Sequence, residues 1–409
     1  TTEIYTLSLH DALPILLINM KKGVNMKKTL EEFQAAVARR TTEISDAKAN
    51  GAKLVQYTGN FIPDELIRAA GADAYPMWRG GEPEPPDAML DESIRFLNPY
   101  ARSMVGFYKL NLDPIMEMAD LVAVSATDCH VQRMAELLEG YGINTWKVGV
   151  PTDWKNSTSY DYYANMLHKL LDKVTAITNQ SVDQEKLLDY VRKTNTINDL
   201  LRKISALRDS QSTPIGGYEF IQLNQLSAIA APDTAIHYLT EFYEKAKNAA
   251  PKFSKKVPRI LFVGHTIAVG DYIVPKKIED YGALIAYEIL DEGCRWYEQD
   301  IKTEGDMFEN LTRARYCERT PISLFEPAWK QRVAELKRIV KEKEIDGIVW
   351  YQLLYDEIYD MEYTCLAKWM SEDKTPLISL QTSYEYTREA MAPLNNRIES
   401  FITTLKGGL

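Results

Sequence analysis

The sequence has few cysteines, and they are scattered. Its four cysteines, Cys129, Cys294, Cys317 and Cys365, form no C-x-x-C pair, which argues against a zinc ribbon or a thioredoxin motif. Scattered cysteines in a large acidic chain are typical of a reducing compartment rather than of a disulfide scaffold. The alternative that each is a small buried apolar side chain stays open.

Long hydrophobic runs and an excess of positive charge are also missing. No stretch approaches the roughly 18 apolar residues that a membrane-spanning helix needs. The net charge of -10 disfavours nucleic acid or an anionic membrane as the main partner, because both bind a cationic face. We therefore expect a soluble, cytoplasmic protein that binds neither nucleic acid nor membrane.

The first residues differ from the rest of the chain. The run from Thr1 to Ile18 has an apolar patch that contains a proline and lacks a positive flank, so it is a poor signal peptide. Its string TEIYTLSLHDALPI resembles translated sequencing-adapter read-through. We expect residues 1–25 to be a non-native or disordered leader that the fold does not need, and the natural protein to start at Met20 or Met26.

Two similar series of elements predict two α/β halves. A chain of 409 residues with 45% hydrophobic and 26% charged residues has room for two or three domains. Short apolar strands alternate with helices, which is the pattern of a parallel sheet. These strands are expected at 53–57, 121–124, 145–150, 259–263, 283–287, 346–351 and 376–380.

The predicted fold is therefore α/β, with two Rossmann-like parallel-sheet domains joined by a helical segment. The N-terminal α/β domain is expected over 26–180, the helical connector over 181–257 and the C-terminal α/β domain over 258–409. Thr29 to Glu32 fits a capping box at the start of the first helix. The Pro/Gly/Glu-rich stretch 80–86 predicts a loop.

Polar residues follow several of these strands. Thr127 to His130 comes after the strand at 121–124, and Asp356 to Glu362 comes after the strand at 346–351. Ligands of parallel sheets bind at the carboxyl ends of strands, so both segments are candidates for one site. The acids at 356–362 could instead cap and solubilise the start of a helix.

A third segment after a strand, Gly264 to Gly270, carries a weaker signal. It lacks G-x-G-x-x-G and G-K-[ST], the usual nucleotide fingerprints. An ordinary turn that needs glycine explains it, although a helix N-terminus at such a loop can accept a phosphate.

Five blocks of sequence follow one another along most of the chain: Ile62–Gly71, Asn98–Gly106, Asp120–Leu138, Asp346–Val349 and Ala392–Phe401. In order and spacing they resemble the family of 2-hydroxyacyl-CoA dehydratase and benzoyl-CoA reductase subunits, which includes the D-component of 2-hydroxyglutaryl-CoA dehydratase. No single block is specific, and the order and spacing carry the resemblance.

The resemblance implies a subunit of an anaerobic 2-hydroxyacyl-CoA dehydratase-like complex, a hydro-lyase. Such a complex removes water from a 2-hydroxyacyl-CoA through a ketyl radical. The implied partners are a paralogous cluster-bearing subunit in a heterodimer, an ATP-dependent iron–sulfur activator protein and the acyl-CoA substrate. Three alternatives stay open: a non-catalytic or cluster-altered partner subunit, a benzoyl-CoA reductase-type subunit, and a cofactor-binding α/β protein without electron chemistry.

The resemblance also implies an iron–sulfur cluster (4Fe-4S) held by three cysteines, and here the chain departs from the pattern. The family positions fall on Asn98, Asp128 and Asp356, whose hard oxygen atoms replace soft thiolates poorly. Cys129 is the first candidate metal ligand, because a helix N-terminus beside it would lower the pKa of its thiol, and Cys365 is the second. The substrate or cleft candidates are Asn98, Arg102, Asp128, His130, Asp356 and Glu357.

Overall fold

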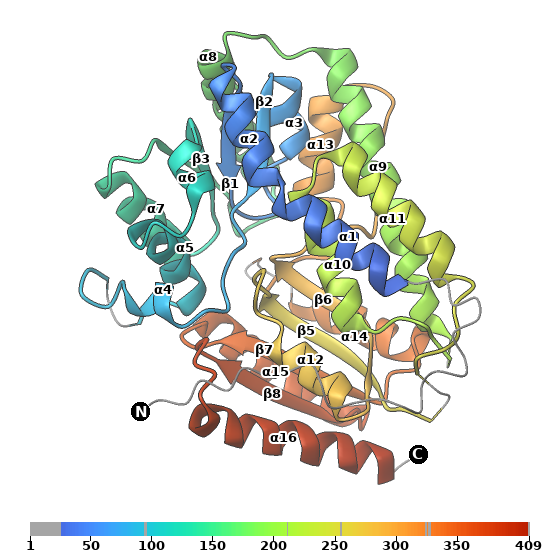
Figure 1. Cartoon of the computed structure of the whole chain (residues 1–409). Coiled ribbons are helices and arrows are strands. Elements are labelled where there is room, and N and C mark those ends of the chain that lie inside the picture. The colour runs from blue at the N-terminus through green and yellow to red at the C-terminus, as the bar shows by residue number, and fades with distance from the viewer. Residues whose placement is uncertain are drawn as a thin grey trace, which may run out of the picture.

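Two parallel sheets form the framework of the chain (Figure 1). The computed structural model describes residues 26–93, 96–210, 212–253, 256–323, 325 and 329–407. The strand orders are β2-β1-β3-β4 and β6-β5-β7-β8, and every pair is parallel. This confirms the predicted α/β class with two Rossmann-like sheets. The predicted leader, residues 1–25, lies outside the described residues, and the boundaries 26–180, 181–257 and 258–409 stay predictions.

All the strands except β2 lie close to their expected positions. The strands are β1 (Lys53–Tyr57), β2 (Ala72–Pro76), β3 (Leu121–Ala126), β4 (Thr145–Gly149), β5 (Arg259–Thr266), β6 (Leu284–Glu292), β7 (Gly347–Leu353) and β8 (Leu377–Thr382). The helices of the first part are α1 (Met26–Ala38), α2 (Arg40–Ala49), α3 (Asp64–Ala69), α4 (Glu84–Asp87), α5 (Pro99–Lys109), α6 (Pro114–Met118), α7 (Cys129–Gly140) and α8 (Ser157–Thr178). Those that follow are α9 (Gln184–Ala206), α10 (Gly217–Ile229), α11 (Pro232–Ala246), α12 (Ile273–Asp280), α13 (Met307–Tyr316), α14 (Trp329–Glu342), α15 (Glu357–Glu372) and α16 (Arg388–Gly407).

Helices cover both faces of the second sheet, which explains its continuous apolar strands. In β5, Ile260 and Phe262 pack with α12 and α16, whereas Leu261 and Val263 pack with α14 and α15. A strand covered on both faces needs apolar side chains at consecutive positions rather than at every second one. The apolar run 259–263 therefore identified this strand from the sequence.

Three local expectations differ from the structure. Helix α1 already includes Met26, so Thr29 lies inside the helix and no capping box begins there; its hydroxyl instead bonds to Glu241 and Lys245 of α11. The stretch 80–86 is not wholly a loop, because α4 begins at Glu84, where two prolines suit the first turn of a helix. Strand β2 was not expected, since Ala72–Pro76 has only alternating burial and ends in proline.

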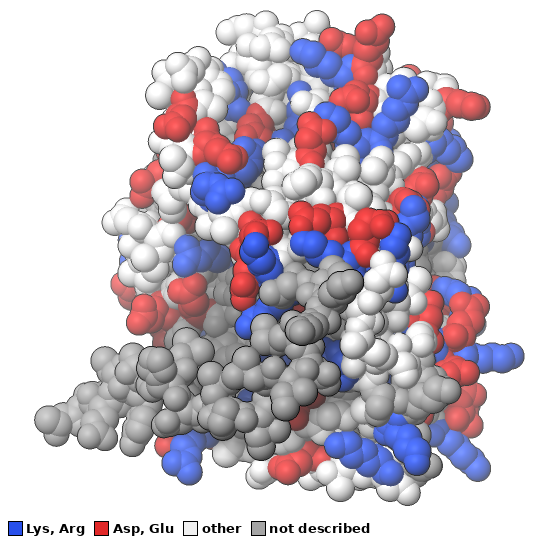
Figure 2. All heavy atoms as spheres, turned by 45° about the vertical axis from the view of Figure 1, so that its right-hand side comes forward, with Lys and Arg blue, Asp and Glu red and all other residues white. Residues whose placement is uncertain are grey.

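The face drawn in Figure 2 carries Lys, Arg, Asp and Glu side chains interspersed rather than a continuous basic surface. Many ion pairs join residues one helical turn apart, such as Lys193 and Asp189. Among the described residues, no helix combines the length and apolar character required to cross a membrane.

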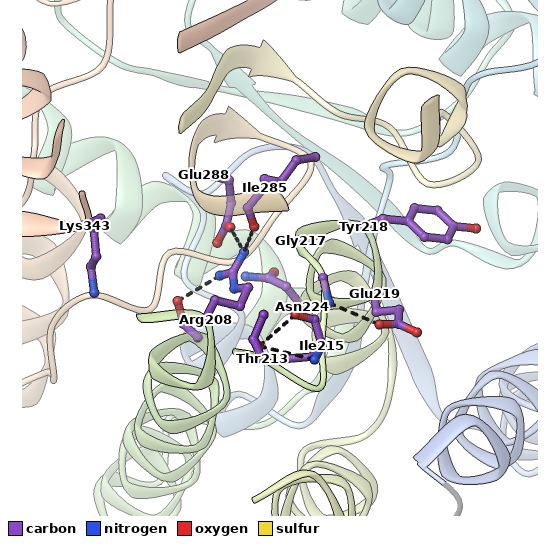
Figure 3. Close-up of polar contacts among 12 residues, drawn as sticks. Arg208, Thr213, Ile215, Gly217, Tyr218, Glu219, Asn224, Ile285, Glu288 and Lys343 are labelled. Carbon is purple, nitrogen blue, oxygen red and sulfur yellow. Dashed lines mark hydrogen bonds and ion pairs between the residues drawn. The ribbon is translucent and has the colours of Figure 1, made fainter. Parts of the chain in front are cut away.

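A buried ion pair ties the helical segment to the second sheet (Figure 3). Arg208, just after α9, is 0% exposed, and its Nη1 lies 2.6 Å from Glu288 Oε2 in β6. The same guanidinium donates to the carbonyl of Ile285 and lies 4.1 Å from the ring centre of Phe220. Removing one partner of a buried ion pair lowers the free energy of unfolding by much more than the intact pair contributes to it, because the other charge stays buried without a partner.

We therefore expect Glu288→Ala to lower the free energy of unfolding by roughly 3–5 kcal/mol. Guanidinium denaturation followed by tryptophan fluorescence measures the change. Asp280→Ala is the matched control, because Asp280 pairs with Lys276 at the surface and exposed pairs contribute little. An equal decrease in the free energy of unfolding in both variants would contradict the assigned role of the Arg208–Glu288 pair.

Candidate functional site

Three of the predicted site residues occupy one kind of position, the residue just before a helix. Asn98 precedes α5, Asp128 precedes α7 and Asp356 precedes α15. Asn98 Oδ1 accepts a hydrogen bond from the backbone N–H of Ala101 at 2.8 Å, and Asp128 Oδ1 accepts one from Val131 at 2.9 Å. Asn and Asp are among the best residues for capping a helix in this way.

Asn98 and Asp356 meet between the two sheets. Asn98 Nδ2 donates to Asp356 Oδ1 at 2.8 Å, and the two residues are 2% and 4% exposed. The other oxygen of Asp356 lies 3.4 Å from His265 Nδ1 at the end of β5. One buried polar network thus joins the starts of α5 and α15 to the end of β5, through Asn98, Asp356 and His265.

A cavity of about 300 Å³ lies beside this network. Its lining comes from the carboxyl ends of four strands, as expected for parallel sheets: Thr127–His130 after β3, His265 in β5, Glu292 in β6 and Asp356–Tyr359 after β7, with Ile322 completing it. The structure therefore brings Asp128, Cys129, His130, Asp356 and Glu357 together.

The ring of His130 links the two sides of the cavity. Its Nδ1 accepts the backbone N–H of Asn98 at 3.3 Å, and its Nε2 lies 3.3 Å from Glu357 Oε2. Since Nδ1 is an acceptor, the ring proton is on Nε2, which donates to the Glu357 carboxylate.

Cys129 is exposed, and its thiol is less acidic than the sequence analysis expected. Desolvation and the nearby carboxylates of Asp128 and Glu357 raise the pKa of this thiol. The backbone N–H groups of the helix start lower it, but they are outweighed. The expectation of a lowered pKa was wrong because it counted the helix terminus and left out the burial of the thiol and the acids around it.

His265 and Glu292 are cavity residues that the sequence analysis did not identify. Burial alone would lower the pKa of His265, but the carboxylates of Asp356, Asp128 and Asp291 raise it to about 9. Burial raises the pKa of Glu292 to about 8, although His265 opposes this shift. Both residues end buried strands, so the rule that found Asp128 and Asp356 could have found them.

Two predicted site residues lie elsewhere. Arg102 is buried in α5, where its guanidinium donates to the carbonyls of Leu97 and Pro86. Cys365 lies two turns along α15 and is not among the cavity-lining residues that the structure describes.

The donors present do not fit a cluster held by three cysteines. Asn98 and Asp356 bond to one another, and the thiol that lines the cavity, Cys129, has a raised pKa. Iron–sulfur clusters need thiolates, which are softer than amide and carboxylate oxygens. Over the described ranges, no group of three or more His, Cys, Asp or Glu side chains is arranged to hold a metal ion.

The chain is thus an α/β protein with two parallel sheets and a cavity at the carboxyl ends of their strands. The family model for the D-component of 2-hydroxyglutaryl-CoA dehydratase matches residues 60–405, which is nearly the whole chain. The chain therefore belongs to this dehydratase-component family. Among curated proteins, none matches it.

The raised pKa of His265 predicts a pH-dependent contribution of Asp356 to stability. Because the pKa of His265 is raised from 6.5 to about 9, its protonated ring stabilises the fold fully below about pH 6.5. This contribution is lost as the pH rises through about 9. Asp356→Asn keeps the shape of the side chain but removes its charge, so it should lower the pKa of His265. The free energy of unfolding should fall by roughly 2–3 kcal/mol at pH 6 and change little above pH 9.

An NMR titration of His265 and denaturation at both pH values measure these effects. Glu372→Gln, an exposed acid at the far end of α15, is the control and should show neither change. An unchanged His265 pKa in Asp356→Asn would contradict the assigned ion pair.

Proposed function

We propose that this chain is the cluster-altered subunit of a heterodimeric 2-hydroxyacyl-CoA dehydratase-like complex. Membership in the family supports a role as a subunit of such a complex. The observation that carries the finer proposal is the Asn98–Asp356 hydrogen bond, which joins two of the three positions where the family has cluster cysteines.

In this proposal the one-electron (ketyl radical) chemistry depends on the partner subunit. A cysteine-complete paralogue would hold the cluster and receive the electron from the ATP-dependent activator. The cavity of this chain would contribute hydrogen-bonding groups, namely the imidazole of His265 and the protonated carboxyl of Glu292, which are suited to an oxygen of a bound acyl thioester.

Iron content tests this division of roles. We expect the chain purified alone under strict anaerobiosis to bind no stoichiometric iron and to lack the thiolate-to-iron absorbance at roughly 400 nm. Co-expressed with a cysteine-complete paralogue, it should purify as a complex whose iron follows the paralogue. About four irons on the isolated chain would overturn the proposal of altered ligation.

Cysteine variants identify the ligand if iron is found. Cys129 is the thiol at the cavity, so Cys129→Ser should lose any iron that the chain binds, whereas Cys365→Ser should keep it. Iron loss in Cys365→Ser alone would contradict the placement of the site at the start of α7.

A further inference from the structure

Carboxylic acids are the most frequent residues in the described lining of the cavity. Its described lining includes four carboxyl groups, from Asp128, Glu292, Asp356 and Glu357, and no Lys or Arg. The two lining imidazoles are each directed to one of these carboxylates, His265 to Asp356 and His130 to Glu357. The carboxyl of Glu292 is protonated and Asp356 is paired with His265, so an additional negative group in this space would meet like charge from Asp128 and Glu357.

Glu292 is the lining residue that most directly indicates a ligand. It is 9% exposed and faces the cavity, and among the described residues no hydrogen bond or ion pair reaches its carboxyl group. Polar groups this deeply buried are nearly always hydrogen-bonded in native proteins. Gly59 leaves room for it, since a Cβ at that position would lie 2.9 Å from Glu292 Oε1.

The rest of the lining suits a short hydrocarbon group. Ile322 and Tyr359 are buried, and Ile358, which is 37% exposed, lies nearer the solvent. The volume of about 300 Å³ is at the lower end of the range of small-molecule sites, roughly 300–1,000 Å³. The space is suited to the acyl part of a thioester, with the rest of the coenzyme outside.

We propose that this cavity binds an acyl group without a terminal charge, that Glu292 hydrogen-bonds to an oxygen of that group, and that Asp128 and Glu357 exclude acyl groups ending in a carboxylate. This inference rests on the proposed function, because it assigns a substrate class to the same site.

Two thioesters of equal chain length test the exclusion. 2-Hydroxypentanoyl-CoA and 2-hydroxyglutaryl-CoA both have five acyl carbons and differ in the terminal carboxylate. Calorimetric titration of the chain, alone and in its anaerobic complex, should show the pentanoyl thioester binding roughly tenfold or more tightly, because like charges repel in a partly buried site.

Variants of the cavity residues test whether the preference for the pentanoyl thioester comes from the cavity of this chain. Asp128→Asn with Glu357→Gln removes two charges while Asn keeps the helix cap, so the preference should fall to about threefold or less. Glu372→Gln removes an exposed acid of the same helix and should keep the wild-type preference. Glu292→Leu should weaken the binding of the pentanoyl thioester more than Glu292→Gln does, because Gln keeps a hydrogen-bonding group. Circular dichroism checks that each variant folds.

The outcomes separate the two proposals. Equal affinities, tighter binding of the glutaryl thioester, or a preference unchanged by the double variant would overturn the inference. An assembled complex that binds neither thioester would also overturn it, while leaving the proposed role as a subunit intact. Failure to assemble with any cysteine-complete paralogue would contradict the proposed function and the inference together.

Discussion

The hydrogen bond between Asn98 and Asp356 is the contact on which the geometry of the cavity depends. Asn98 uses both ends of its amide: Oδ1 caps α5 through Ala101, and Nδ2 bonds to Asp356. Asp356 in turn lies beside His265. A cysteine at position 98 could not make both bonds, since it lacks the amide donor and acceptor pair. Asn98 and Asp356, which stand where the family resemblance places cysteines, are therefore integrated into the fold.

A second set of buried contacts, away from the cavity, joins residues that follow β1 to segments that follow β6. Both carboxylate oxygens of Glu65 in α3 accept from Nη2 of Arg315 in α13, at 2.8 and 3.0 Å, and Oε1 also accepts from Thr194 of α9. Asn60, after β1, donates to the carbonyl of Cys294 at 2.8 Å. The strand ends of both sheets face one cavity, so side chains far apart in sequence line the same space.

The sequence predicted those features that depend on local pattern. Buried strands such as β5 and β7 were recognisable because both faces are covered, so their apolar residues are consecutive. Strand β2 was missed because Ala72–Pro76 has no such run. At the site, Asp128 and Asp356 could be located as residues following strands. The raised pKa of the Cys129 thiol comes from its burial, from Asp128 and from Glu357, and neither the burial nor the proximity of Glu357, more than two hundred positions away, can be read from the local sequence.

The charges beneath the cavity explain how an acidic site stays ordered in the interior. Tyr359 stacks on His265 with ring centres 4.3 Å apart, and its hydroxyl donates to Asp291 at 2.6 Å. Asp291 also accepts from Arg332, which pairs with Glu362. Buried ion pairs of this kind contribute little net stability compared with apolar packing. Their effect here is orientation: they fix the ring of Tyr359, which lies against His265 and leaves that imidazole facing Asp356 and the cavity.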